Sequence, residues 1–190
     1  MKTQRRLLFA ISFAFLILSF ITSSVPSGWF KAGSNPDDYE MFADKSIFKT
    51  GNSSATIQSN KKKIKGFGTL MQTCLSTEYL GKKVKLSGFI KSENVDGWAG
   101  LWLRVDGQKG EPSLSFDNMQ NRAVKGTTDW NRYEIILNVP ENARTLNFGA
   151  LLSGTGKIWF DDLKFEIVSD IQVNIGKSTP EKPSNLNFEL

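Results

Sequence analysis

Aromatic and charged side chains alternate along one short segment of the sequence, at Trp98, Trp102, Arg104 and Asp106. A β-strand over residues 98–106 places these four on one face and the aliphatic residues between them on the other. Such a face suits a sugar, because a pyranose ring stacks on an aromatic ring while its hydroxyls hydrogen-bond to charged groups. The alternative interpretation is that the two indoles only pack beneath a loop.

Other polar side chains on neighbouring runs extend this candidate site, namely Gln72, Lys91, Asp117 and Asn118. The segment SFDNMQNR (115–122) is either a turn rich in Asn and Asp or one wall of a ligand groove. If the site binds a ligand, we expect Trp102→Ala to weaken binding with little loss of folding stability.

Two adjacent carboxylates, Asp161 and Asp162, follow the apolar pair Trp159 and Phe160. Carboxylate oxygens near a strand can hold a hard cation such as calcium. The alternative is a charged break in an edge strand. The residues leave both interpretations open.

Catalytic machinery is not recognisable in the sequence. The chain contains no histidine, which removes His-based triads and His general bases. It has no GxSxG nucleophile elbow, and among Glu93, Asp96, Asp106 and Asp117 nothing marks a pair suited to glycoside hydrolysis. We therefore expect a protein that is not an enzyme and that has no cofactor other than a structural calcium ion.

The first 24 residues have the three parts of a secretory signal. Lys2, Arg5 and Arg6 precede the apolar run Leu7–Ile21, and the small residues 22–24 follow it. The sequence thus predicts a cleaved signal peptide over residues 1–24 and a secreted or cell-surface protein. An uncleaved N-terminal anchor is the alternative, and only then would the protein contact a membrane.

The charge and the cysteine content of the chain bear on its partners and on how its fold is stabilised. The formal charge of +5 includes three cations of residues 1–24, which hold no acidic residue, so the remainder carries +2. The dense lysine cluster at 61–65 reads as a solvated loop, and no nucleic-acid partner is expected. With Cys74 as its one cysteine, the chain can form no intramolecular disulfide, so core packing must hold the fold together.

The rest of the chain reads as short alternating runs separated by Gly, Asn, Asp and Pro clusters, a pattern typical of an all-β sandwich. The runs are residues 53–59, 66–74, 82–93, 99–106, 113–118, 131–139, 145–152 and 157–168. They predict a jelly-roll β-sandwich of two antiparallel sheets over residues 25–168. A polar linker is expected over 169–183, and residues 184–190 alternate again and are predicted to dock back as a strand.

Several strings in order resemble a family of bacterial jelly-roll domains similar to carbohydrate-binding modules and galactose-binding-like sandwiches. They are GWFKAGSNPDDYE, GFGTLMQ, LSGFIKSENVDGWAGLWLRVDG, FDNMQNR, KGTTDWNRYEIILNVP and GKIWFDDLKFE. The resemblance implies a structural calcium site at Asp161 and Glu189. Some homologues carry the label of AraC-type regulators.

Together, the residues and the resemblance predict an exported, non-catalytic module that binds a carbohydrate or another polar ligand. A structural or envelope-associated domain that meets a protein partner through the same aromatic face is the first alternative. A ligand-sensing domain related to transcriptional regulators is the second. A concave groove at the tryptophans favours a sugar, whereas a flat patch favours a protein.

Overall fold

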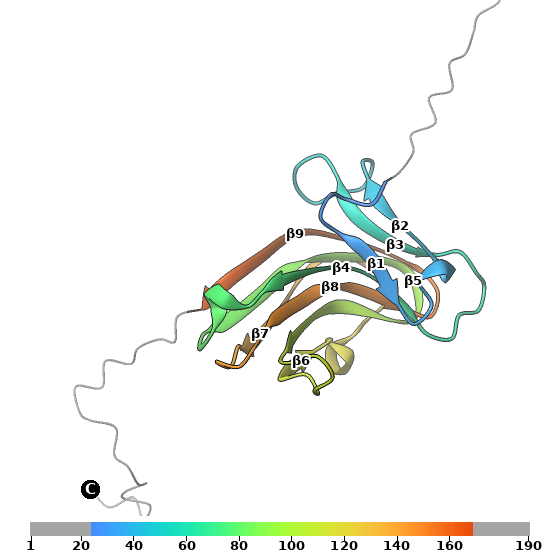
Figure 1. Ribbon diagram of the computed structural model, residues 1–190. Coiled ribbons are helices and arrows are strands. Elements are labelled where there is room, and N and C mark those ends of the chain that lie inside the picture. The colour runs from blue at the N-terminus through green and yellow to red at the C-terminus, as the bar shows by residue number, and fades with distance from the viewer. Residues whose placement is uncertain (1–23, 169–190) are drawn as a thin grey trace, which may run out of the picture.

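The computed structural model describes residues 24–168, which form nine β-strands and three short 3-10 helices (Figure 1). The strands are β1 (Phe30–Gly33), β2 (Tyr39–Asp44), β3 (Ser54–Ser59), β4 (Phe67–Leu75), β5 (Lys83–Asp106), β6 (Ser115–Asp117), β7 (Val124–Asn138), β8 (Thr145–Ser153) and β9 (Lys157–Val168). The helices are η1 (Pro36–Asp38), η2 (Thr77–Tyr79) and η3 (Gln120–Arg122).

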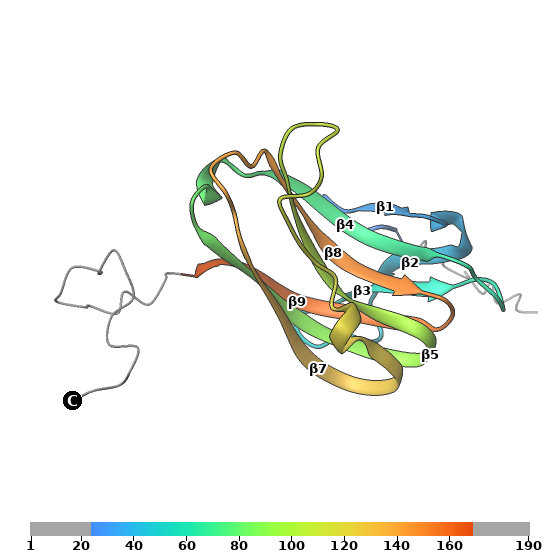
Figure 2. The same ribbon diagram turned by 90° about the horizontal axis from the view of Figure 1, so that it is seen from below.

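The strands build two facing layers that share the long strand β5 (Figures 1 and 2). The first sheet has the order β2, β3, β9, residues 83–93 of β5, then β7. The second has the order β1, β4, β8, residues 98–106 of β5, then β6. Every described pairing is antiparallel, so the fold is the jelly-roll β-sandwich predicted from the sequence.

The chain crosses between the two sheets twice at one corner. There β5 bends at Asn94, which has a positive φ of 52°, and its ladder with β7 shifts register. The turn between β8 and β9 lies alongside, and the Asp96 amide donates to the Thr155 carbonyl over 3.0 Å. A residue in the left-handed region turns the chain sharply without ending the strand, so β5 joins the two sheets as one continuous strand and the β8–β9 turn joins them a second time.

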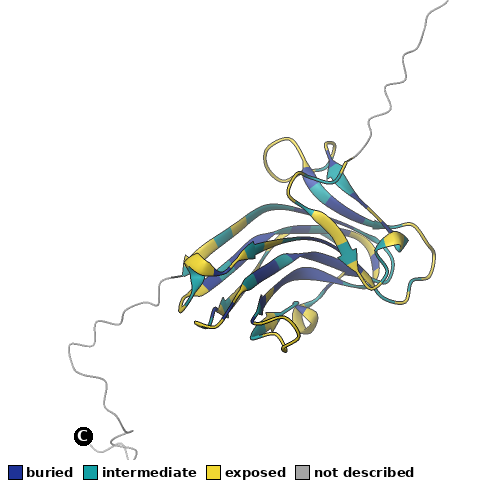
Figure 3. Ribbon diagram, viewed as in Figure 1, coloured by how far each residue is buried: buried dark blue, intermediate teal, exposed yellow. Residues whose placement is uncertain are grey.

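The core lies between the layers and contains the aliphatic faces that the alternation predicted. Side chains fully withdrawn from solvent include Leu86, Leu101, Leu103, Leu146 and Leu152. The central stretches of the strands are buried, whereas the loops and strand ends are exposed (Figure 3). Trp29 caps this core edge-on against Phe148 and Phe160, at centroid distances of 6.1 and 5.7 Å.

The structure corrects three details of the predicted strand list. The runs 82–93 and 99–106 form one strand, because the turn-like residues between them bend β5 at the corner instead of ending it. β7 begins at Val124, earlier than predicted. β1 and β2 were missed, because β1 is short and carries no clear alternation, and because their pairing with β4 and β3 is a tertiary property.

Residues 1–23 and 169–190 lie outside the described part of the chain. The predicted signal peptide, the linker and the docked strand 184–190 therefore remain predictions. Between residues 24 and 168, no helix has the length and apolar content needed to cross a membrane.

Candidate functional site

A pocket of about 380 Å³ opens on the outer face of the second sheet. Strands β1, β4, β5 and β8 supply its floor, and the segment around β6 closes one side. The residues that line it are Ala32, Gly33, Phe67, Thr69, Met71, Trp98, Trp102, Arg104, Phe116, Asn118, Leu151 and Ser153. The predicted aromatic face is therefore concave and not flat.

Trp102 forms the floor of this pocket. Only 7 % of its surface is exposed, and it packs with Met71 and Leu151. Its indole N–H donates to the hydroxyl of Thr69 over 2.8 Å, and that hydroxyl donates to the carbonyl of Ala150 over 2.7 Å. The expectation that Trp102→Ala would barely affect stability is wrong, because removing a buried aromatic ring leaves a cavity and the indole's hydrogen bond to Thr69 is lost.

More accessible rings surround that floor. Trp98 is half-buried, while Phe67 and Phe116 are 37 % and 52 % exposed. Sequence reasoning missed both phenylalanines, although register explains their position. Phe67 lies opposite Ser153, and Phe116 lies opposite Arg104, on the face that carries the tryptophans.

A polar row runs across three strands beside the rings. Arg104 makes an ion pair with Asp106, with Nη2 and Nε at 2.8 and 3.0 Å from Oδ2. The amide of Asn147 donates to the same oxygen over 2.8 Å and accepts from the hydroxyl of Thr73 over 2.7 Å. Asn147 is buried, so this network holds the guanidinium of Arg104 at the edge of the pocket.

The structure brings together only part of the predicted site. Trp98, Trp102, Arg104 and Asn118 line the pocket, and Asp106 adjoins it through Arg104. Gln72 has the opposite phase on β4, in register with Phe148, and lies near Gly28.

Two further predicted residues lie outside the pocket. Lys91 belongs to the first sheet and pairs with Asp129 at 3.0 Å. Asp117 is held by the guanidinium of Arg122 at 2.8 Å and by the Met119 amide at 2.8 Å. Although burial raises the pKa of Asp117, these hydrogen bonds outweigh it and lower that pKa. Asp117 is thus engaged within its own turn.

The predicted cation ligand Asp161 has N–H donors as its neighbours. Its Oδ2 accepts from the amides of Lys49 and Thr50 at 2.7 and 2.9 Å, and its Oδ1 accepts from the Asp162 amide at 2.7 Å. This donor set suits a carboxylate that ties down a loop, and it does not fit a cation. The second predicted ligand, Glu189, lies outside the described residues.

Solved structures share this fold. The CBM22-1 xylan-binding domain from Paenibacillus barcinonensis Xyn10C aligns with a TM-score of 0.55 at 15% identity, over 77% of this chain and 90% of that one. The enzymatically active domain of bacteriophage CBA120 tailspike protein 4 aligns with a TM-score of 0.57 at 14% identity, over 75% and 20%. The chain therefore has the jelly-roll fold seen among carbohydrate-binding modules.

In sequence, the chain is 41% identical over 167 residues to a Bacillus subtilis (strain 168) protein described as the uncharacterized HTH-type transcriptional regulator YbfP. The match covers 85% of this chain, and the chain spans 56% of the length of that relative. No family model matches the sequence.

Proposed function

We propose that this chain is a non-catalytic carbohydrate-binding domain whose site is the aromatic pocket of the second sheet. The observation that carries the proposal is the pocket itself, in which two indoles and two phenyl rings surround an opening of about 380 Å³. Aromatic rings provide apolar faces for the C–H side of a sugar ring. Arg104, Asn118 and the backbone at the rim supply hydrogen bonds for its hydroxyls.

The aromatic rings differ in burial, and we assign them different roles in ligand binding. The buried Trp102, fixed by Thr69, sets the depth of the pocket and is preorganised before a ligand arrives. Trp98, Phe67 and Phe116 retain exposed ring surface and are therefore the rings on which a sugar stacks. The concave shape favours a sugar over the flat contact that a protein partner would need.

Trp98→Ala tests this proposal without removing the buried floor. A glycan array identifies a ligand, and titration calorimetry then compares the wild type with the variant. We expect Trp98→Ala to weaken binding by about 1–3 kcal/mol, which is roughly a fivefold to 150-fold increase in Kd.

Trp130→Ala provides the matched control. Trp130 is likewise half-buried, but it lies on β7 in the first sheet and does not line the pocket. It should leave affinity unchanged. Equal effects of the two substitutions, or a folded protein that binds no glycan, would contradict the proposal.

The sequence relative favours a second candidate function, that of a ligand-sensing domain in a regulator. Its description as an HTH-type regulator and the 41% identity motivate this alternative. The same pocket would then report a sugar to an attached domain. The basic and apolar N-terminal pattern instead supports export. Cell fractionation with mass spectrometry of the N-terminus distinguishes an exported domain from an intracellular sensor. Finding the protein in the cytosol with residues 1–24 intact would exclude secretion.

A further inference from the structure

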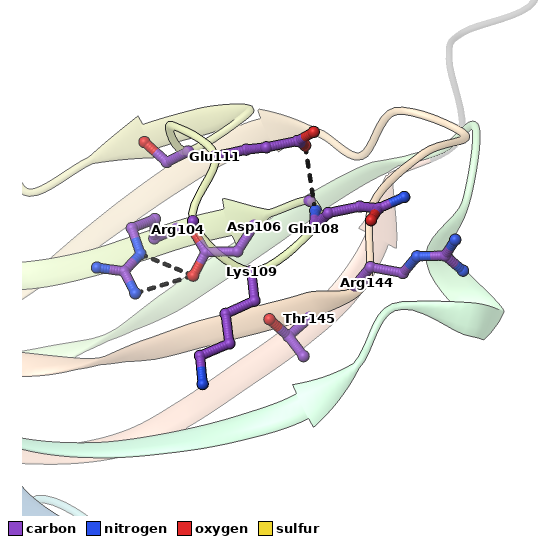
Figure 4. A pocket seen from close by; sticks show the side chains of 10 residues that line it. Arg104, Asp106, Gln108, Lys109, Glu111, Arg144 and Thr145 are labelled. Carbon is purple, nitrogen blue, oxygen red and sulfur yellow. Dashed lines mark hydrogen bonds and ion pairs between the residues drawn. The ribbon is translucent and has the colours of Figure 1, made fainter.

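A second, larger pocket of about 780 Å³ adjoins the aromatic one at the end of β5 (Figure 4). The loop between β5 and β6 forms one wall, and the start of β8 forms the other. No hydrophobic residue is among those that line it, which are Arg104, Asp106, Gly107, Gln108, Lys109, Gly110, Glu111, Ser113, Arg144 and Thr145.

Cations outnumber anions on this lining, at Arg104, Lys109 and Arg144 against Asp106 and Glu111. Asp106 already accepts from Arg104 and Asn147, and Glu111 accepts from the backbone amide of Gln108 at 3.3 Å. Neither Lys109 nor Arg144 has an ion-pair partner among residues 24–168. An anion entering the pocket therefore meets a lining whose charged side chains sum to +1, three cations against two anions.

Arg104 lines both pockets, so the two pockets adjoin at its side chain. Trp102 and Arg104 are successive outward positions on β5, roughly 7 Å apart along the strand. Figure 4 shows the side chain of Lys109 extending to the same side of Asp106 as the Arg104 guanidinium, while Arg144 points to the other end. A ligand stacked on the rings can thus place an acidic group against Lys109 and Arg104.

We infer that the combined groove recognises an acidic glycan, with sugar rings on the aromatic pocket and a carboxylate or phosphate in the cationic one. The inference rests on the proposed function, since the aromatic pocket must hold the sugar. Charge-assisted hydrogen bonds to a guanidinium and an ammonium are stronger than those between neutral groups. Among glycans that share one sugar backbone, the protein would therefore bind those with an acidic substituent most tightly.

Matched pairs of probes test this inference by calorimetry at low and moderate salt. One pair is a glucuronate-substituted xylo-oligosaccharide and its unsubstituted form. Another is an oligogalacturonate and its methyl ester. A third is an oligomannoside with and without a 6-phosphate. We expect an acidic member to bind at least about tenfold more tightly than its neutral partner, with affinity that falls as salt rises. The third pair distinguishes phosphate from carboxylate.

Lys109→Gln tests whether the Lys109 ammonium is responsible for the preference for acidic glycans. It should remove most of the preference for the acidic probe while leaving the neutral probe bound as before. Lys125→Gln is the control, because Lys125 is also exposed but lies on β7 in the first sheet. Equal affinity for acidic and neutral partners, with Trp98→Ala still weakening both, would overturn this inference alone. Binding to none of the probes or array glycans would overturn it together with the proposed function.

Discussion

Asp44 is a charged residue that hydrogen bonds hold inside the fold. Its carboxylate is buried at the end of β2, yet it accepts hydrogen bonds from the Trp159 indole at 2.9 Å and from the Ser46 amide at 2.8 Å. Burial raises the pKa of Asp44, but these bonds, with those of the Ser46 hydroxyl and the Ile47 amide, outweigh it and lower the pKa to about 2.

Asp44→Asn keeps the shape of this side chain and removes its charge. Because the folded pKa is depressed from 3.8 to about 2, the stabilisation is fully present above pH 4 and is lost as pH falls through 2. We expect the variant to lose about 2 kcal/mol at neutral pH and to approach the wild type near pH 2. Urea unfolding across this pH range measures it, with the exposed Asp37→Asn as the control. A stability difference that does not change with pH would contradict the assignment.

At the scale of elements, the corner between the sheets decides whether β5 and the β8–β9 pair stay in register. Gly156 has a φ of +126°, and a Cβ there would lie 2.7 Å from the carbonyl oxygen of Asn94 and from the Cα of Val95. The close approach explains why glycine occupies this turn. It also means that the corner cannot relax around a side chain without moving backbone.

Gly156→Ala should therefore destabilise the protein more than backbone strain alone would. Gly110 offers a matched control, because its φ is +94° and a Cβ there would meet nothing within 4 Å. We expect Gly110→Ala to cost about 1–3 kcal/mol from its φ alone, and Gly156→Ala to cost more because of the steric clash. Chemical denaturation of both variants tests this. Equal losses of stability in the two variants would show that the backbone at the corner moves to accommodate the added Cβ at no energetic cost.

At the scale of the whole molecule, the two sheets are mechanically joined. β5 contributes residues 83–93 to one sheet and residues 98–106 to the other, and the β8–β9 pair runs antiparallel to it across both. Neither sheet can be unpaired without disturbing a strand that belongs to its partner. The described domain should accordingly unfold as one cooperative unit.

Native-state hydrogen exchange can verify this cooperativity. Leu86 lies in the first sheet and Leu103 in the second, and both are fully buried on β5. We expect their amides to exchange with the same opening free energy, equal to that of global unfolding. An amide that exchanges much faster in one sheet than in the other would indicate separately opening layers and would contradict the shared-strand argument.

The sequence by itself determined the fold class and the facing of the tryptophan strand. Alternation is a local property, so residues 98–106 showed both their core side and their aromatic side without any neighbour. Only the tertiary structure decided what surrounds that strand. Pairing brought Phe67 and Phe116 to the tryptophans, set Gln72 on the opposite face and left Lys91 in the other sheet. The reason is that register joins segments far apart in the chain, and no single strand encodes its partners.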